Sequence, residues 1–354
     1  MSKETIALIE LGGSHDECLL SQVLALKSVD VNILLVLDTK TANRNTYLIS
    51  KVNETLVFEH PKNAIKSFLA LNKLAKTLKN KGVTKMVFNT AQGGHVRNLT
   101  FLLSKKITCY GIIHTIKKFE GSFTQNFIFR RVKRFLVLSD DLLKKAKTVR
   151  GIHVESFYPL DFQLVDRKIQ KTKDEVWITI PGEFETRRKD IGALLSMIEQ
   201  SPENARFILL GKAKKEHDEV RLFFEQLETS GQSHKLISFD HFVEETLFLD
   251  YVQQSDFLLP LIHPATQSAE EYIHRQISGA FSLAYSFAIP LLIHKSFADV
   301  LDFQYSAAFY EPQSFETDLA QAIQQQGIIS KRIQSVVKWQ AANRHEKYVR
   351  FLGV

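Results

Sequence analysis

Three adjacent cations are the residues of this sequence whose types and spacing point most directly to chemistry. Arg187, Arg188 and Lys189 stand together after the apolar segment 176–180. Adjacent cations can neutralise a diphosphate leaving group, whose charge grows in the transition state of group transfer. A solvated helix start explains the same run equally well, so this stretch alone leaves both interpretations open.

Two segments of small residues could bring backbone amides close to a phosphate. Gly12 and Gly13 follow the first apolar segment, and Ser278, Gly279 and Ala280 lead into an expected helix. The amides at a helix N-terminus attract anions and would hold phosphate oxygens. The sequence contains neither G-x-G-x-x-G nor G-x-x-x-x-G-K-[ST], which disfavours dinucleotide redox chemistry and P-loop chemistry.

A histidine ends one of the expected strands. His114 follows the apolar residues 110–113, and in that position it can donate a hydrogen bond or move a proton near neutral pH. A structural role is the commoner one for a lone histidine. His15 and His95 follow other strands of the same half, but no H-x-x-x-H spacing or carboxylate pair accompanies them, so we expect no metal site.

The elements that must position these residues form a repeating α/β pattern. Short apolar segments alternate with amphipathic ones, which predicts two parallel sheets covered by helices, with ligands bound after the carboxyl ends of strands. The expected strands are 6–11, 31–37, 85–89, 108–114, 135–139, 176–180, 207–210, 235–239, 257–259 and 290–293. The expected helices are 18–27, 61–81, 191–200, 217–229, 244–254, 279–287, 315–326 and 331–351. The polar segment 158–175 reads as a linker.

Composition bounds the class of protein. A chain of 354 residues, 44% hydrophobic and 24% charged, is long enough for two domains and is neither disordered nor fibrous. Cys18 and Cys109 are its two cysteines, so a disulfide framework is excluded, and both read as core residues. No apolar run suits a signal peptide or a membrane span, so we expect a cytoplasmic protein.

Positive charge gathers in the first half. Residues 61–150 hold 20 basic and 3 acidic side chains, which would attract nucleic acid, anionic lipid or a phosphorylated substrate, or simply keep helix faces soluble. In the helix 61–81, we expect Ile65, Phe68 and Leu69 to share a buried stripe with residues 74, 75 and 78, with lysines opposite. This helix and residues 127–134 are candidate membrane contacts. No nucleic-acid-binding motif is present, so we expect no nucleic-acid partner.

The order of these segments resembles that of the two-domain GT-B glycosyltransferases, particularly the nucleotide-sugar-dependent retaining group with a C-terminal donor domain (glycosyltransferase family 4-like). Residues 112–115 resemble the family's strand that ends in an active-site histidine. Residues 180–195 resemble its glycine loop and the later lysine that binds donor phosphates. The other stretches that resemble the family, in order along the chain, are 135–145, 207–211, 239–260, 278–292 and 307–323.

The resemblance implies an α/β fold of two Rossmann-like domains facing each other across a cleft. Residues 1–160 would bind the acceptor, residues 161–335 the nucleotide-sugar donor, and the helix in 336–354 would return toward the first domain. The implied activity is transfer of a sugar from a nucleoside diphosphate to a saccharide or lipid-linked acceptor, with retained configuration and without a metal or other cofactor. Such an enzyme of polysaccharide biosynthesis would be cytoplasmic, with peripheral contact to an anionic inner membrane surface.

The resemblance also assigns residues to roles. The implied catalytic residues are His114, Arg188 and Lys189. The implied donor-binding residues are Gly12, Gly13, Gly182, Phe242, Ser278, Gly279 and Ala280.

The chain departs from the family at three positions. Arg275 and Leu283 occupy the places of two glutamates, the second of which normally holds the ribose hydroxyls, so Glu270, Glu271 or Tyr285 would take that role. Glu183 stands where an arginine usually follows the glycine of the phosphate loop. The missing glutamates keep a second interpretation open, in which the protein is a catalytically silent GT-B-like binding or scaffold protein.

Overall fold

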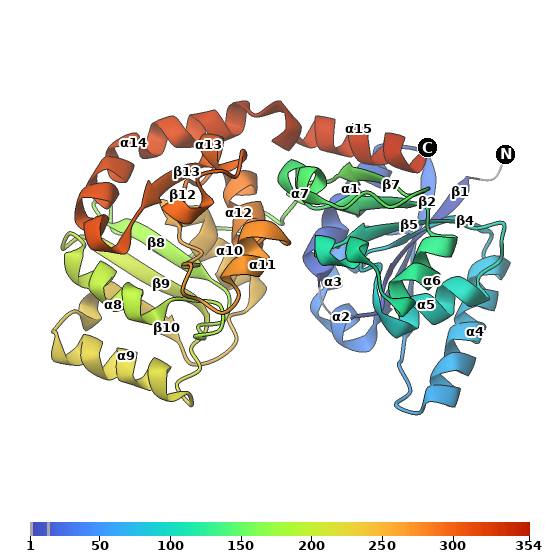
Figure 1. The fold of residues 1–354 in the computed structure, drawn as a ribbon, viewed down its shortest axis with the longest axis horizontal. Coiled ribbons are helices and arrows are strands. Elements are labelled where there is room, and N and C mark those ends of the chain that lie inside the picture. Colours follow the sequence, from blue (N-terminus) through green and yellow to red (C-terminus); the bar gives the residue numbers. More distant parts are fainter. Residues whose placement is uncertain (1–2, 13–14) are drawn as a thin grey trace. The chain divides into compact units, whose positions relative to one another are not determined.

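The computed structural model describes residues 3–12 and 15–354 and divides into two compact units. Unit 1 consists of Met1–Phe162 and Gln340–Val354, and unit 2 consists of Gln163–Trp339. Each unit contains one sheet of parallel strands with helices around it, as the alternating pattern of the sequence predicts (Figure 1).

Unit 1 contains a seven-stranded sheet in the order β3-β2-β1-β4-β5-β6-β7. Its strands are β1 (Glu4–Glu10), β2 (Val31–Asp38), β3 (Glu54–Phe58), β4 (Val83–Phe88), β5 (Thr108–Ile113), β6 (Arg134–Val137) and β7 (His153–Ser156). In β1, Ile6, Ala7, Leu8 and Ile9 are all buried, which indicates that both faces of the sheet are covered. The strand order changes direction between β1 and β4, the place where α/β sheets usually bind ligands.

Two layers of helices cover this sheet. They are α1 (Leu19–Lys27), α2 (Thr39–Arg44), α3 (Thr46–Ile49), α4 (Ala64–Asn80), α5 (Gly93–Leu102), α6 (Phe123–Arg131), α7 (Asp140–Lys145) and α15 (Ala341–Leu352). Helix α1 packs against α15, and α5 packs between α4 and α6 (Figure 1). Right-handed crossovers that leave the central strand in opposite directions put α1 and the α4–α6 row on opposite faces.

Unit 2 contains a six-stranded sheet in the order β10-β9-β8-β11-β12-β13. Its strands are β8 (Val176–Pro181), β9 (Ala205–Lys212), β10 (Leu236–Phe239), β11 (Phe257–Leu258), β12 (Leu291–His294) and β13 (Ala307–Tyr310). Its helices are α8 (Ile191–Gln200), α9 (Asp218–Thr229), α10 (Glu245–Gln254), α11 (Ala269–His274), α12 (Gly279–Phe287), α13 (Phe303–Ser306) and α14 (Phe315–Ser335). Here the order changes direction between β8 and β11.

The structure corrects several sequence expectations. Strands β3, β7 and β13 were not among the expected ones, because each has only four or five residues and half or more of the residues in each are partly exposed. Helix α4 starts at Ala64 with Asn63 as its N-cap, whereas Pro61 was expected inside the first turn. The expected helix 331–351 is interrupted after Ser335 and resumes at Ala341.

The apolar side chains of α4 divide differently from the expected stripe. Leu71, Leu74, Ala75 and Leu78 are buried, but Ile65, Phe68 and Leu69 are exposed. None of the helices in the described ranges is both long and apolar enough to cross a bilayer. Both Cys18 and Cys109 are buried free thiols, in agreement with their expected place in the core.

Candidate functional site

The loop after β8 is built on two glycines. Gly182 has a φ of +86°, a left-handed conformation that side chains rarely adopt. Gly211, at the end of the neighbouring β9, lies so close that a Cβ atom there would stand 2.4 Å from the carbonyl oxygen of Gly182. The loop therefore turns directly against the backbone of β9, which fixes the start of the segment that carries Arg188 and Lys189.

Lys189 points into the protein rather than into solvent. Its Nζ donates a hydrogen bond of 2.8 Å to the carbonyl oxygen of Pro181, and the residue is only 6% exposed. Burial, with a smaller effect of the neighbouring Arg188, lowers the pKa of Lys189 to about 7. A cation that is half protonated at neutral pH can respond to an incoming phosphate by taking up a proton.

Glu185 gathers the other cations of this loop. Its Oε1 lies 3.1 Å from Nε of Arg188 and 3.2 Å from a guanidinium nitrogen of Arg187. Its Oε2 accepts a hydrogen bond of 2.8 Å from Nζ of Lys214, which follows β9. The contact between Glu185 and Lys214 could not be predicted from the sequence, because Lys214 belongs to a different loop and only the fold brings it to Glu185.

A buried polar chain supports the end of the same loop. Asp190 caps α8 by accepting a hydrogen bond of 3.0 Å from the amide of Ala193. Its second oxygen lies 2.9 Å from Nδ1 of His263, and Nε2 of His263 lies 2.7 Å from the hydroxyl of Tyr310. The hydrogen bond to His263, more than any other influence, lowers the pKa of Asp190. This chain ties together the segments after β8 and β11 and the end of β13.

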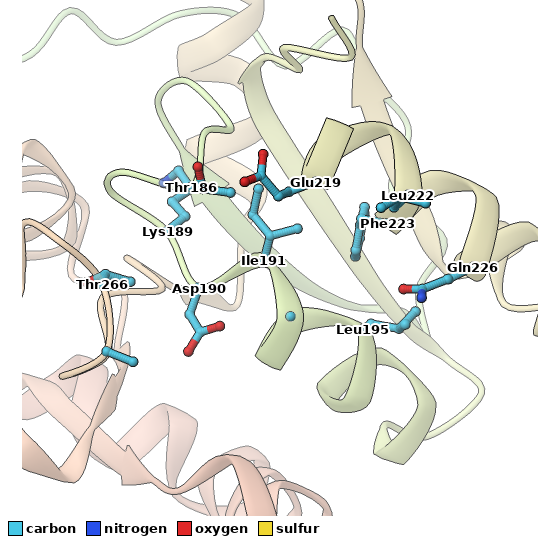
Figure 2. Close-up of a pocket in the computed structure, with 12 residues that line it drawn as sticks. Thr186, Lys189, Asp190, Ile191, Leu195, Glu219, Leu222, Phe223, Gln226 and Thr266 are labelled. Atoms are coloured by element: carbon cyan, nitrogen blue, oxygen red, sulfur yellow. The ribbon is translucent and has the colours of Figure 1, made fainter. Parts of the chain in front are cut away.

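A pocket of about 360 Å³ opens where α8 begins beside α9. Lys189 and Asp190 line it together with Thr186 and Thr266. Figure 2 shows Glu219, Leu222, Phe223 and Gln226 of α9 facing Ile191 and Leu195 of α8. The backbone of the cationic loop thus borders a pocket with polar and apolar walls.

The other expected donor-binding residues of unit 2 lie in segments that follow the strands of the same sheet. Ser278 is the N-cap of α12, and its hydroxyl accepts a hydrogen bond of 3.4 Å from the amide of Ala280. An added Cβ at Gly279 would meet no atom within 4 Å, and Gly279 is exposed, whereas the next residue, Ala280, is buried. Phe242, in the loop after β10, is 87% exposed. Unit 2 therefore presents cations, helix amides and a free aromatic ring at the carboxyl ends of its strands.

Two of the three residues considered for ribose recognition are engaged elsewhere. Tyr285 is buried and stacks on Trp339 with ring centroids 4.1 Å apart. Glu271 accepts a hydrogen bond of 3.1 Å from Arg275, and Leu283 is buried within α12. Glu270 has a mostly exposed side chain that approaches His274 at 3.7 Å. Of the expected candidates, Glu270 keeps its side chain in solvent.

In unit 1, a buried carboxylate organises the turn after β1. Glu10 is fully buried and accepts hydrogen bonds from the amide of Gly12 (2.6 Å), the side chain of Asn89 (2.7 Å) and the hydroxyl of Thr90 (2.6 Å). Burial raises the pKa of Glu10 despite these donors. The amide of Gly12 is thus already used within the protein, and Gly13 lies outside the described residues.

His114 lies beneath His15 at the end of β5. Their rings stack with centroids 3.9 Å apart, and His15 has a left-handed backbone with a φ of 65°. Nε2 of His114 donates a hydrogen bond of 2.7 Å to the carbonyl oxygen of Asn89, while Nδ1 is buried with no partner among the described residues. Burial, and then the charge of His15, lowers the pKa of His114 to about 4. At neutral pH the imidazole is therefore neutral, with Nε2 donating to Asn89 and Nδ1 able only to accept, which disfavours a proton shuttle near neutral pH.

A second pair of histidines lies near the same edge. The rings of His60 and His95 are 4.2 Å apart, and Nε2 of His60 contacts the carbonyl oxygen of Leu11 at 2.9 Å. Although four histidines follow neighbouring strands, the described part of the chain has no group of three or more His, Cys, Asp or Glu side chains arranged to hold a metal ion.

Comparisons with known proteins identify the class of fold. No family model matches the sequence, and no curated protein matches it either. Among solved structures, Anabaena HepE in complex with UDP-glucose superposes with a TM-score of 0.69 at 13% identity, covering 99% of both chains. The lipopolysaccharide outer core galactosyltransferase WaaB in its apo form gives a TM-score of 0.61 at 12% identity, covering 98% of this chain and 99% of that one. A putative UDP-N-acetylglucosamine 2-epimerase from Listeria monocytogenes gives 0.62 at 9%, covering 98% and 95%.

These likenesses span the whole length of the chain and establish its architecture. The protein has the two-domain GT-B fold of glycosyltransferases, with two Rossmann-like α/β units. At identities of 8 to 14% the neighbours show the fold alone, and the presence of an epimerase among them means that activity must be argued from the site.

Proposed function

We propose that this protein is a glycosyltransferase that moves a sugar from a nucleoside diphosphate to a saccharide or lipid-linked acceptor. One observation carries the proposal: the strand ends of unit 2 combine the cationic loop of Arg188 and Lys189, the helix start at Ser278–Ala280 with its exposed Gly279, and the exposed ring of Phe242. A diphosphate needs the cations and amides, and a nucleobase can stack on an aromatic ring. Because the HepE neighbours were crystallised with UDP and UDP-glucose, UDP is the first nucleotide to test and UDP-glucose the first donor.

The proposed chemistry rests on stabilising the leaving group. As the bond between sugar and diphosphate breaks, negative charge grows on the bridging phosphate oxygen. Arg188 and the protonated form of Lys189 would neutralise that charge, and the amides at the start of α12 would bind the phosphate oxygens. No metal is needed for this role, because fixed cations replace it. Retention of the anomeric configuration is part of the proposal and follows from the family resemblance.

We propose that unit 1 binds the acceptor. The Nδ1 atom of His114 is a buried hydrogen-bond acceptor without a partner in the described residues, and a sugar hydroxyl would satisfy it. A lipid-linked acceptor would bring the enzyme to an anionic membrane, and the basic composition of residues 61–150 supports such a peripheral contact.

A thermal-shift series with UDP, GDP, CDP, ADP and dTDP tests the donor site, each with and without magnesium. A ligand that binds only the native state, at about 100 times its dissociation constant, adds about 2.7 kcal/mol, which moves the unfolding midpoint measurably. We expect a shift with one diphosphate that Arg188→Ala/Lys189→Ala removes. The matched control is Arg167→Ala/Lys168→Ala, another adjacent Arg–Lys pair with exposed side chains, which should leave the shift unchanged.

Incubation with the matching nucleotide sugar then separates the possible activities. Transfer to a saccharide acceptor, with the product configuration read by NMR, supports the proposal, whereas release of an epimerised sugar would assign epimerase chemistry instead. A catalytically silent binding protein is the second candidate, because Arg275 and Leu283 stand where the family has glutamates. Nucleotide binding without any turnover, or no nucleotide binding at all, would favour that second candidate.

A further inference from the structure

The first two turns of α4 expose apolar side chains that a folded domain would normally bury. Ile65 is 72% exposed, Leu69 is 59% exposed and Phe68 is 41% exposed. The helix does have a buried stripe, formed by residues such as Leu71 and Leu74, so these three are not needed for packing. Large apolar residues clustered in solvent mark an interaction surface more often than single ones do.

Lysines surround these apolar side chains. Lys66 precedes Leu69 by three residues and Lys73 follows it by four, so both are its neighbours on the helix surface. Lys62 precedes the N-cap residue Asn63, and Lys76 lies about one turn beyond Lys73. Within the ranges that the structure describes, none of these four lysines has an ion-pair partner. Their charges are therefore available to an external anion.

The bias in charge extends along the row formed by α4, α5 and α6. Residues 60–119 contain twelve Lys and Arg and no Asp or Glu. Two more exposed aromatic rings belong to this row, Phe101 at 79% and Phe123 at 72% exposed. Lys81 pairs with Glu54 and Lys85 with Glu4, but the lysines around the exposed apolar side chains of α4 have no acidic partner in the described residues. A partner that is negatively charged and also accepts apolar side chains would fit this surface.

We propose that this part of α4 binds the surface of an anionic lipid bilayer. We call the set Lys62, Ile65, Lys66, Phe68, Leu69, Lys73 and Lys76 the α4 surface. Its apolar side chains would enter the headgroup region while its lysines bind lipid phosphates, the arrangement that holds amphipathic helices at membranes. A nucleic-acid backbone would attract the lysines but would leave three apolar side chains in water, so lipid accounts for both halves of the observation.

This inference names the surface for the peripheral membrane contact in the proposed function, and it rests on that part of the proposal. Its test needs no nucleotide and no turnover. The full-length protein is sedimented with phosphatidylcholine vesicles, with and without phosphatidylglycerol, at low and high salt. We expect binding only with phosphatidylglycerol, weakened by salt because the attraction is partly electrostatic.

Two sets of variants separate the contributions of charge and apolar contact. Lys62→Gln/Lys66→Gln/Lys73→Gln should weaken vesicle binding roughly 100-fold, since each lysine near an anionic surface contributes about fivefold. Ile65→Ser/Leu69→Ser should weaken it roughly tenfold or more, because burial of their apolar side chains is lost. The matched controls are Lys168→Gln/Lys173→Gln/Lys331→Gln and Ile328→Ser, which change exposed lysines and an exposed helical isoleucine of unit 2.

Each outcome of these experiments either supports or overturns the inference. Loss of vesicle binding in the α4 variants, with their folding and the nucleotide shift unchanged, supports the inference. Absence of vesicle binding by the unaltered protein would overturn it and would leave the nucleotide result standing. Binding to RNA or duplex DNA in preference to vesicles would also overturn it. Equal loss in the α4 variants and the unit 2 controls would show a general effect of charge and would remove α4 as the specific contact.

Discussion

The Nζ atom of Lys189 donates a hydrogen bond of 2.8 Å to the carbonyl oxygen of Pro181. The Lys189 ammonium group, which we propose binds a phosphate, is therefore held inside the protein by the strand that precedes it. Because burial lowers its pKa to about 7, the side chain changes charge in the range where the protein is expected to work. If Lys189 binds the diphosphate as proposed, its burial makes nucleotide binding depend on pH.

We expect binding of a nucleoside diphosphate to be coupled to protonation of Lys189. A bound diphosphate favours the charged ammonium, so its affinity should weaken as the pH rises above about 7, by up to about tenfold per pH unit. The useful window is about pH 7.5 to 9, where the phosphates themselves no longer titrate. Isothermal titration calorimetry in two buffers of different ionisation enthalpy measures the proton uptake directly. The Lys189→Met variant should bind weakly and show a flat profile; a steep profile in that variant would assign the proton to another group.

We expect Gly211→Ala to destabilise unit 2 and to disturb the cationic loop. The new Cβ would stand 2.4 Å from the carbonyl oxygen of Gly182, and neither backbone segment can move without breaking the β8–β9 ladder. A cost of about 1–3 kcal/mol in the free energy of unfolding is typical of such overpacking, measured by urea denaturation. Gly327→Ala, an exposed position inside α14 with free space around it, is the control and should stabilise by up to about 1 kcal/mol.

We expect Tyr310→Phe to weaken the chain that joins Asp190, His263 and Tyr310. The variant keeps the ring but removes the hydroxyl that contacts Nε2 of His263, leaving a buried nitrogen without its partner. The cost should be about 1–3 kcal/mol in urea denaturation. Tyr305→Phe, which changes a half-exposed ring in α13, should cost less than about 0.5 kcal/mol. Equal costs for the two variants would mean that the hydrogen bond to His263 contributes nothing to stability.

Local patterns in the sequence predicted the fold well where strands were apolar and flanked by turns. The central strands β1, β2, β4, β8 and β9 all coincide with expected ones. The short edge strands β3 and β7 lack such a pattern, since they are half exposed and owe their conformation to pairing with a neighbour. Helix α4 shows the other limit: a stripe of apolar residues says which side chains could be buried, and only the packing around the helix decides which of them are.

The candidate site was predictable where residues are adjacent in sequence and unpredictable where the fold brings distant residues together. Arg188 and Lys189 could be found because they are consecutive and follow a strand. Other contacts of the site join residues that follow different strands, and no local sequence pattern predicts them. They are Glu185 with Lys214, Asp190 with His263, and His114 with His15. The burial that lowers the pKa of Lys189 is likewise a property of the folded chain.

We expect His114 to make the native state sensitive to mild acid. Its pKa falls from an ordinary value near 6.5 to about 4, so between these values the unfolded chain binds more protons than the native state. The free energy of unfolding should therefore decrease by up to about 3 kcal/mol as the pH is lowered through this window. His114→Gln, which can still donate to the carbonyl oxygen of Asn89, should flatten the profile in urea denaturation at several pH values. The exposed His241→Gln control should leave it unchanged, and a flat profile in the unaltered protein would contradict the burial argument.

Phe242 offers the sharpest separation of binding from stability. The side chain is 87% exposed, so Phe242→Ala should change the free energy of unfolding by less than about 0.5 kcal/mol. If its ring stacks on the nucleobase, the same variant should lose about 1–3 kcal/mol of binding energy for the nucleoside diphosphate, roughly fivefold to 150-fold in affinity. Inorganic pyrophosphate, which has no base, should bind both forms equally, and this comparison isolates the stacking. Phe123→Ala, which changes another highly exposed phenylalanine (72% exposed) in unit 1, is the matched control. A Phe242 variant with undiminished nucleotide affinity would remove this loop from the donor site and leave recognition of the base to other residues of unit 2.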